Sequence, residues 1–160
     1  MESLREGQNM ITAKDIMTEK VITVRPETPL EEFARILIEN RISGAPVVDK
    51  DGNLVGIITE NDLINQNKRL HIPTVIRLFD AFIMLESPGK IKDEIKRITA
   101  TTVWDICTKE VVTVSEDTPL QEIATIMSEK KIHLLPVMRD KRIVGIIGKA
   151  DIIKAMAYKP

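Results

Sequence analysis

The chain repeats its own sequence once. The segment from Asp15 to Ile64 recurs from Asp105 to Ile153, at an offset of 90 residues that a single deletion in the second copy reduces to 89. Both copies contain a Thr-Pro-Leu tripeptide, a Pro-Val pair and a Val-Gly-Ile-Ile run in the same order. A repeat this long is not that of a solenoid, so the sequence predicts two small domains that fold against each other.

Length and charge narrow the possible functions. Each repeat has only about 50 residues, so burial between the repeats is expected to supply much of the stability. The formal net charge of −1 argues against nucleic acid or an anionic membrane as a partner. We find no signal peptide and no apolar run of about 18 residues, which predicts a cytoplasmic protein. The one cysteine, Cys107, aligns with Met17 and is expected to be buried.

The first half of each repeat predicts a strand followed by a helix. Residues 21–24 form a β-branched run typical of a strand. Thr28-Pro29-Leu30 then predicts a helix start, with Thr28 as the N-cap and Pro29 at the first helical position. Apolar residues follow at the spacing of one helix face. These are Leu30, Phe33, Ala34 and Leu37.

The second half of each repeat predicts a hairpin and a last helix. Residues 45–48 and 54–59 are strand-like and are joined through Asp51-Gly52, a dipeptide suited to a tight turn. A helix is expected to begin near Thr59 or Glu60. The resulting order gives a mixed α/β (α+β) fold, in which each repeat is a small three-stranded sheet with helices on one face. The other face of each sheet would then pack on its twin.

The repeat also predicts the domain boundaries, with residues 11–67 as the first repeat and residues 101–157 as the second. Residues 68–100 have no counterpart elsewhere in the chain. An apolar run from Val75 to Leu85 and a helical pattern from Lys90 to Ile98 predict an ordered connector. Its role stays open between bracing the two repeats and forming a partner-binding or dimer surface.

The sequence offers little material for catalysis. His71 and His133 are far apart, no Cys/His cluster has the spacing of metal ligands, and neither a nucleophile elbow nor a P-loop occurs. We therefore expect no enzymatic activity and no metal site.

The best candidate for a binding site is the segment from Gly56 to Asp62. A strand ends here and a helix begins, so backbone N–H groups and the positive end of a helix dipole face any bound anion. Thr59 adds a hydroxyl, and the Asp62 carboxylate suits the two hydroxyls of a ribose. The alternative is that both residues only cap their own helix. The second repeat has Gly148 in place of the threonine and keeps Asp151, which leaves both interpretations open.

The doubled pattern resembles a known family. The Thr-Pro-Leu start, the G-A-P-V or L-L-P-V strand and the terminal G-x-x-T/S-x-x-D resemble a tandem cystathionine-β-synthase (CBS) domain pair, also called a Bateman module. The resemblance covers residues 11–157 apart from the connector. It implies a pseudo-twofold pair with two clefts between the repeats, which in this family commonly bind AMP, ADP, ATP or S-adenosylmethionine.

The family's binding roles carry over to two composite sites, each drawing on both repeats. His133 follows a position at which some family members place a basic phosphate contact, although a histidine before an apolar strand is more often structural. Lys149, in the turn after the last strand, is within reach of a phosphate or is simply solvated. Gly148 removes a hydroxyl from the second site, so either its affinity is lower or its backbone supplies more of the contacts. The residues implied for the first site are Thr59, Asp62, Thr108, Val112, His133, Leu134 and Leu135. Those implied for the second are Asp151, Thr18, Ile22, Ser43, Gly44 and Ala45.

The sequence thus predicts a stand-alone regulatory module that binds an adenosyl ligand and senses energy state or a metabolite. The resemblance also implies a disc-like homodimer formed through helices at the repeat ends, and a regulated partner that the sequence does not identify. The alternative is a protein–protein interaction or dimerisation scaffold whose clefts stay empty.

Overall fold

The computed structural model describes residues 10–69 and 101–158, which form two compact units. The central unit runs from Ile22 to Val111, and the C-terminal unit combines the segment up to Val21 with the chain from Val112 onward. The connector predicted at residues 68–100 lies, apart from residues 68 and 69, outside the described part of the chain.

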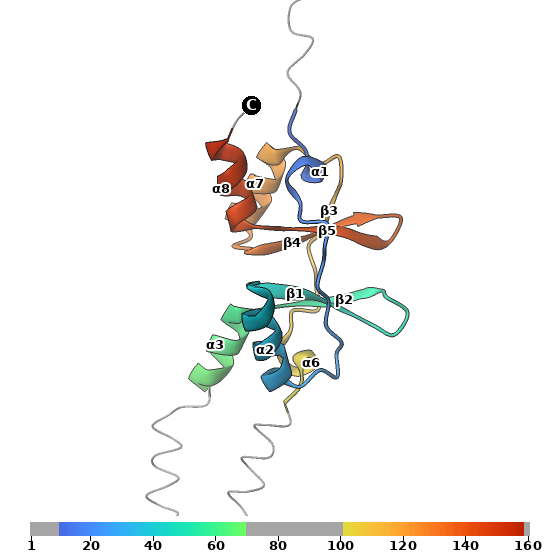
Figure 1. Ribbon diagram of the computed structural model, residues 1–160, viewed down its shortest axis with the longest axis vertical. Coiled ribbons are helices and arrows are strands. Elements are labelled where there is room, and N and C mark those ends of the chain that lie inside the picture. Colours follow the sequence, from blue (N-terminus) through green and yellow to red (C-terminus); the bar gives the residue numbers. More distant parts are fainter. Residues whose placement is uncertain (1–9, 70–100, 159–160) are drawn as a thin grey trace, which may run out of the picture. The chain divides into compact units, whose positions relative to one another are not determined.

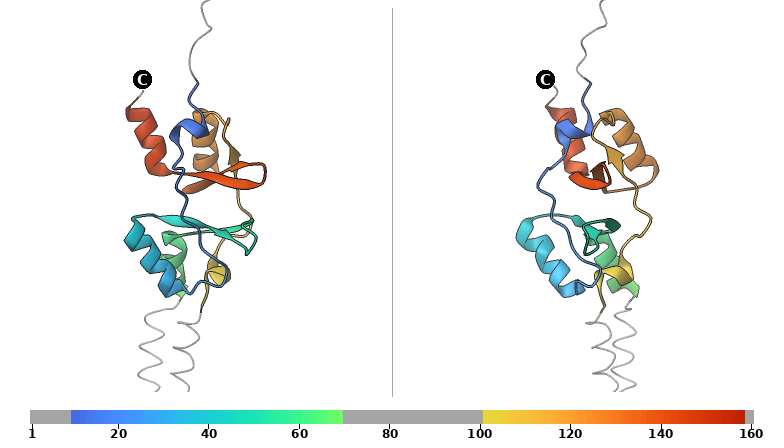
Figure 2. Two further views of the ribbon diagram at one scale, coloured as in Figure 1. Left: turned by 45° about the vertical axis from the view of Figure 1, so that its right-hand side comes forward. Right: turned by 90° about the vertical axis from the view of Figure 1, so that its right-hand side faces the viewer.

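The central unit is built on one hairpin. Strands β1 (Gly44–Val48) and β2 (Leu54–Thr59) pair antiparallel. Helices α2 (Leu30–Asn40), α3 (Glu60–Arg69) and α6 (Val103–Ile106) lie on one side of this hairpin (Figures 1 and 2). The strand predicted at residues 21–24 is reduced to a single parallel bridge between Val24 and Val47.

The C-terminal unit has the same plan with a fuller sheet. Strands β3 (Val114–Ser115), β4 (Leu134–Arg139) and β5 (Arg142–Gly148) lie in the order β3-β4-β5, with β3 parallel and β5 antiparallel to β4. Helices α1 (Ala13–Ile16), α7 (Leu120–Glu129) and α8 (Lys149–Ala157) lie on one side of this sheet (Figures 1 and 2). The predicted three-stranded sheet with helices on one face is confirmed here.

The two units exchange the segments that precede their first strands. Thr18, from the start of the first repeat, pairs with Ile146 of β5, through N–H to O distances of 2.9 and 3.0 Å. Thr108, from the start of the second repeat, pairs in the same way with Ile57 of β2, at 2.9 Å in both directions. Each unit therefore contains chain from both sequence repeats.

The cores follow the apolar stripes that the sequence predicts. In the central unit, Phe33 and Leu37 of α2 are buried against β1 and β2. Their counterparts Ile123 and Met127 of α7 are buried in the C-terminal unit. Cys107 is buried as expected, and this burial raises the pKa of its thiol.

The predicted helix cap at Thr28 is wrong by one position. Helix α2 begins at Leu30 with Pro29 as its N-cap, and Pro29 supplies no side-chain bond. The Thr28 hydroxyl instead accepts a hydrogen bond from the Arg25 N–H at 3.1 Å. The threonine therefore closes the turn before the helix, as Thr118 does for Ser115 in the second copy.

Candidate ligand-binding site

Asp62 lies in the first turn of α3 and caps that helix with one of its two oxygens. Its Oδ2 accepts hydrogen bonds from the Thr59 N–H at 2.8 Å and from the Thr59 hydroxyl at 3.3 Å. Within the described residues, no hydrogen bond reaches Oδ1. Thr59 and Asp62 therefore do form a helix cap, and this cap engages only one of the two carboxylate oxygens.

Asp151 has the equivalent position in α8. Its Oδ2 accepts a hydrogen bond from the Gly148 N–H at 2.7 Å. Since glycine has no hydroxyl, the second half of the cap is missing. Both aspartates are half-buried, at a strand-to-helix junction where the helix dipole favours an anion.

The same cap occurs in two further places, which the sequence analysis did not identify. Asp15 Oδ2 accepts from the Thr12 N–H at 2.9 Å, and Asp105 Oδ2 accepts from the Thr102 N–H at 2.8 Å. The signal was present as a Thr-x-x-Asp spacing at the start of each repeat. These caps belong to four-residue helices and leave Asp15 and Asp105 exposed.

The residues next to each strand-to-helix junction come from the neighbouring strand of the same hairpin. Gly44 lies opposite Thr59 in the β1–β2 hairpin, and the Glu60 N–H donates to the Ser43 carbonyl at 2.8 Å. In the C-terminal unit, Leu134 lies opposite Gly148. Ser43 and Gly44 therefore lie beside Thr59, and His133 and Leu134 lie beside Gly148.

The site residues divide between the units, so the composite grouping of the two sites stays a prediction. The central unit holds Ile22, Ser43, Gly44, Ala45, Thr59, Asp62 and Thr108. The C-terminal unit holds Thr18, Val112, His133, Leu134, Leu135, Lys149 and Asp151. The side chains of Ala45 and Leu135 are fully buried in the cores, so only their backbone groups can face a ligand.

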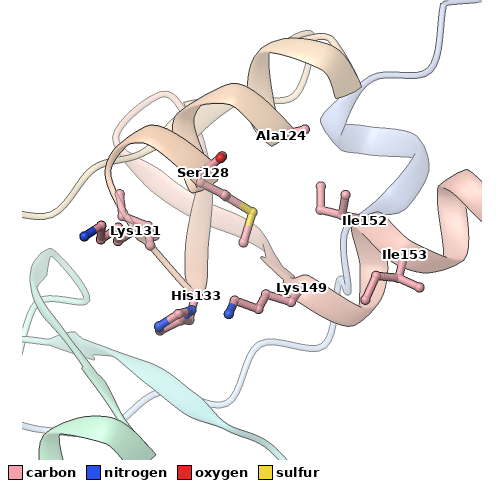
Figure 3. A pocket seen from close by; sticks show the side chains of 9 residues that line it. Ala124, Ser128, Lys131, His133, Lys149, Ile152 and Ile153 are labelled. Carbon is pink, nitrogen blue, oxygen red and sulfur yellow. The ribbon is translucent and has the colours of Figure 1, made fainter.

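A pocket of about 480 Å³ opens between α7 and α8 in the C-terminal unit. Its lining combines apolar side chains with Ser128, His133 and two lysines. The lining residues are Ala124, Met127, Ser128, Lys131, Ile132, His133, Lys149, Ile152 and Ile153. Figure 3 shows Lys149 extending towards His133 along the edge of this pocket.

His133 has one polar atom without a partner. Its Nδ1 is buried and makes no hydrogen bond in the described structure. A buried imidazole nitrogen costs free energy unless it is hydrogen-bonded, so His133 Nδ1 marks a place where a ligand atom or a water would be stabilising.

In the same described residues, no group of three or more His, Cys, Asp or Glu side chains is placed to hold a metal ion.

No helix within residues 10–69 and 101–158 is long and apolar enough to cross a membrane.

Comparison with known proteins identifies relatives along nearly the whole chain. MJ1426 of Methanocaldococcus jannaschii is 32% identical, and the match covers 98% of this chain and 97% of the relative. The Arabidopsis thaliana chloroplastic CBS domain-containing protein CBSX1 is 30% identical over 90% of this chain, a match that covers 63% of that relative. An L-aspartate semialdehyde sulfurtransferase of Methanocaldococcus jannaschii is 31% identical, but only 23% of the enzyme is covered. The matched module therefore makes up most of some relatives and a small part of others.

Solved structures share the fold. The CBS domain pair of protein MJ0100, in complex with 5′-methylthioadenosine and S-adenosyl-L-methionine, has a TM-score of 0.73 and 29% identity, and the match covers 94% of this chain and 99% of that one. CBSX2 in complex with AMP has a TM-score of 0.68 at 23% identity, covering 91% and 96% of the two chains. The model of the CBS domain family matches residues 13–68 and 103–158. The chain therefore belongs to the CBS domain family and carries a tandem pair of CBS domains.

Proposed function

We propose that the chain binds an adenosyl ligand and acts as a regulatory module without chemistry of its own. The proposal rests on the Asp62 carboxylate, of whose two oxygens only one is engaged in hydrogen bonds within the described residues. Oδ2 caps α3 through Thr59, and Oδ1 accepts no hydrogen bond from the described residues. An ionised carboxylate oxygen is a strong acceptor for the vicinal hydroxyls of a ribose.

The ligand class is supported by the CBS domain pair of MJ0100. That protein binds 5′-methylthioadenosine and S-adenosyl-L-methionine and is 29% identical to this chain. The two compounds share the adenosyl group and lack a phosphate. A ribose contact by Asp62, and by Asp151 in the second repeat, fits what they have in common.

Two residues of the C-terminal unit, Lys149 and His133, lie where they would favour a ligand that carries a phosphate group. Lys149 is exposed at the start of α8, and His133 lies beside Gly148 at the start of β4. A cation and an imidazole near a helix N-terminus favour AMP, ADP or ATP over S-adenosylmethionine, which carries positive charge of its own. We propose these two residues as the phosphate contacts.

We further propose that the protein works in the cytoplasm as a homodimer and senses energy state or a metabolite. Apolar side chains that face solvent on α2, α3 and α8 support a contact with another chain. The same feature favours a second candidate function, a dimerisation or interaction scaffold in which the aspartates serve only as caps.

Isothermal titration of the wild-type protein separates the two functions. AMP, ADP, ATP, S-adenosylmethionine, 5′-methylthioadenosine and NAD are titrated at concentrations up to millimolar. Saturable binding of at least one adenosyl compound is expected. Heat changes no larger than the dilution blank for all of them would leave the scaffold as the better description.

A further inference from the structure

The strand-to-helix junctions of the two units differ in charge at two matching positions. The repeat alignment places Glu60 against Lys149 and Ser43 against His133. Glu60 is the first residue of α3, Lys149 is the first residue of α8, and both are exposed. One junction thus carries a carboxylate and a hydroxyl where the other carries an ammonium group and an imidazole.

A third matching position carries the same charge in both units. Arg41 and Lys131 are exposed and have nearly the same backbone conformation, with φ values of 54° and 53°. Since both are cations, this position does not distinguish the junctions. In formal charge, Arg41 and Glu60 cancel in the central unit, whereas Lys131 and Lys149 add in the C-terminal unit.

The first helical turns differ in the same sense. The first turn of α3 contains two acids, Glu60 and Asp62, whereas that of α8 contains Asp151 together with Lys149. The N-terminus of a helix favours an anion, but two carboxylates in the first turn repel a further negative group. A phosphate is therefore disfavoured at the start of α3 and favoured at the start of α8.

The basic side chains of the C-terminal unit lie around one cavity. Lys131, His133 and Lys149 all line the pocket between α7 and α8, and Lys149 extends towards His133 (Figure 3). His133 Nδ1 makes no hydrogen bond within the described residues. A phosphate group offers several acceptor oxygens, so it can pair with two ammonium groups and with an imidazole N–H that donates.

From these observations we propose that the chain has a single phosphate subsite, formed by Lys131, His133 and Lys149, and that its other adenosyl site takes a ligand without phosphate. Glu60 and Ser43 select that ligand, because Glu60 repels a phosphate and accepts an uncharged or cationic group. One chain would then hold AMP and 5′-methylthioadenosine at the same time. This inference rests on the proposed adenosyl function and adds which ligand each site prefers.

The stoichiometry of AMP in isothermal titration tests the single subsite. AMP should bind wild-type protein with one equivalent per chain, and 5′-methylthioadenosine should still bind, also with one equivalent, to protein saturated with AMP. Two equivalents of AMP with similar affinity, or no binding of 5′-methylthioadenosine to the AMP-saturated protein, would overturn the inference and leave the adenosyl function standing. If neither compound binds the wild-type protein, the adenosyl function itself fails.

Charge exchange tests which residues determine the preference. Lys149→Glu should weaken AMP at least about tenfold, the loss expected for bonds to a charged group, and leave 5′-methylthioadenosine within about twofold of wild type. Lys154→Glu is the matched control, because it makes the same change of charge on α8 at an exposed residue outside the pocket lining, and it should bind AMP as wild type does. Equal losses of AMP in the two variants, or an equal loss of both ligands in Lys149→Glu, would contradict the assignment.

A gain of binding provides an independent arm. The double variant Ser43→His/Glu60→Lys gives the central unit the residues of the C-terminal one, so AMP should bind with a second equivalent. Thermal unfolding by circular dichroism checks that each variant is folded. A folded double variant that still binds one equivalent of AMP would show that these two positions do not select the ligand.

Discussion

The side chain of Met17 occupies the space that Gly145 leaves open. A Cβ atom on Gly145 would lie 2.3 Å from Met17 Sδ and 3.0 Å from Met17 Cβ. In the central unit, a Cβ on Gly56 would lie 3.0 Å from Cys107 Sγ and 3.1 Å from the Thr108 carbonyl oxygen. The glycine of each Val-Gly-Ile-Ile run therefore admits a segment that comes from the other sequence repeat.

Replacement of Gly145 by alanine should destabilise the protein by about 1–3 kcal/mol, because the added methyl group forces Met17 out of its place. In the double variant Gly145→Ala/Met17→Ala the closest clash, with Met17 Sδ, is removed and only the 3.0 Å approach to the Cβ of residue 17 is left, so the loss should be smaller than the sum of the two single losses. Urea denaturation of the four proteins measures this coupling. Strictly additive losses would show that the two side chains do not compete for the same space.

The pair formed by Glu116 and Arg139 should make stability depend on pH at the acid end. Arg139 donates from Nε to Glu116 Oε2 at 2.7 Å and from Nη2 to Oε1. These bonds lower the pKa of Glu116. A lowered folded-state pKa contributes stability that is present above the unfolded-state pKa and is lost as the pH falls through the folded-state value.

Arg139→Ala should therefore reduce the unfolding temperature at neutral pH, and the difference from wild type should shrink as the pH falls below the usual range of a glutamate. Thermal unfolding between pH 3 and pH 7, at about 0.1 M salt, measures it. Arg35→Ala is the control, because it breaks the exposed Arg35–Glu31 pair within one helix, which is expected to matter little. A difference that stays constant down to the lowest pH would contradict this account.

Cys107 should resist thiol reagents in the folded protein. It is buried, and desolvation raises its pKa, so little thiolate is present at neutral pH. Reaction with a chromogenic disulfide reagent at pH 7 should be far slower than in denaturant. Comparable rates in the two conditions would mean that the α6 segment opens readily.

The elements were predictable where one short stretch of sequence determines them. The apolar residues spaced along one helix face, Phe33 among them, correctly predicted helix α2. The Asp51-Gly52 dipeptide correctly predicted the first hairpin turn, in which Gly52 has a φ of 82°. The second hairpin turns through Asp140 and Lys141, both at positive φ without glycine, which local preference alone would not suggest.

The exchange of segments was not predictable from the repeat. Sequence alignment places Thr108 in the second repeat, whereas its backbone pairs with Ile57 of the first. Such pairing depends on long-range contacts, which a repeat pattern does not encode. The candidate site was predictable only in part, since the motif identified Asp62 but not which of its oxygens is already engaged by Thr59.

The central claim is that Asp62 binds a ligand as well as capping its helix, and Asp105 is the matched control within the same unit. Asp105 Oδ2 accepts from the Thr102 N–H at 2.8 Å and from the Thr102 hydroxyl at 3.1 Å. Asp62→Ala and Asp105→Ala should therefore each cost about 1 kcal/mol of stability as lost caps.

The most direct measurement is isothermal titration of AMP and of S-adenosylmethionine into the wild-type protein and these two variants. We predict that Asp62→Ala weakens binding by at least about tenfold, the loss expected for hydrogen bonds to a charged group, and that Asp105→Ala binds as wild type does. Equal affinities for wild type and Asp62→Ala, or equal losses in both variants, would contradict the claim.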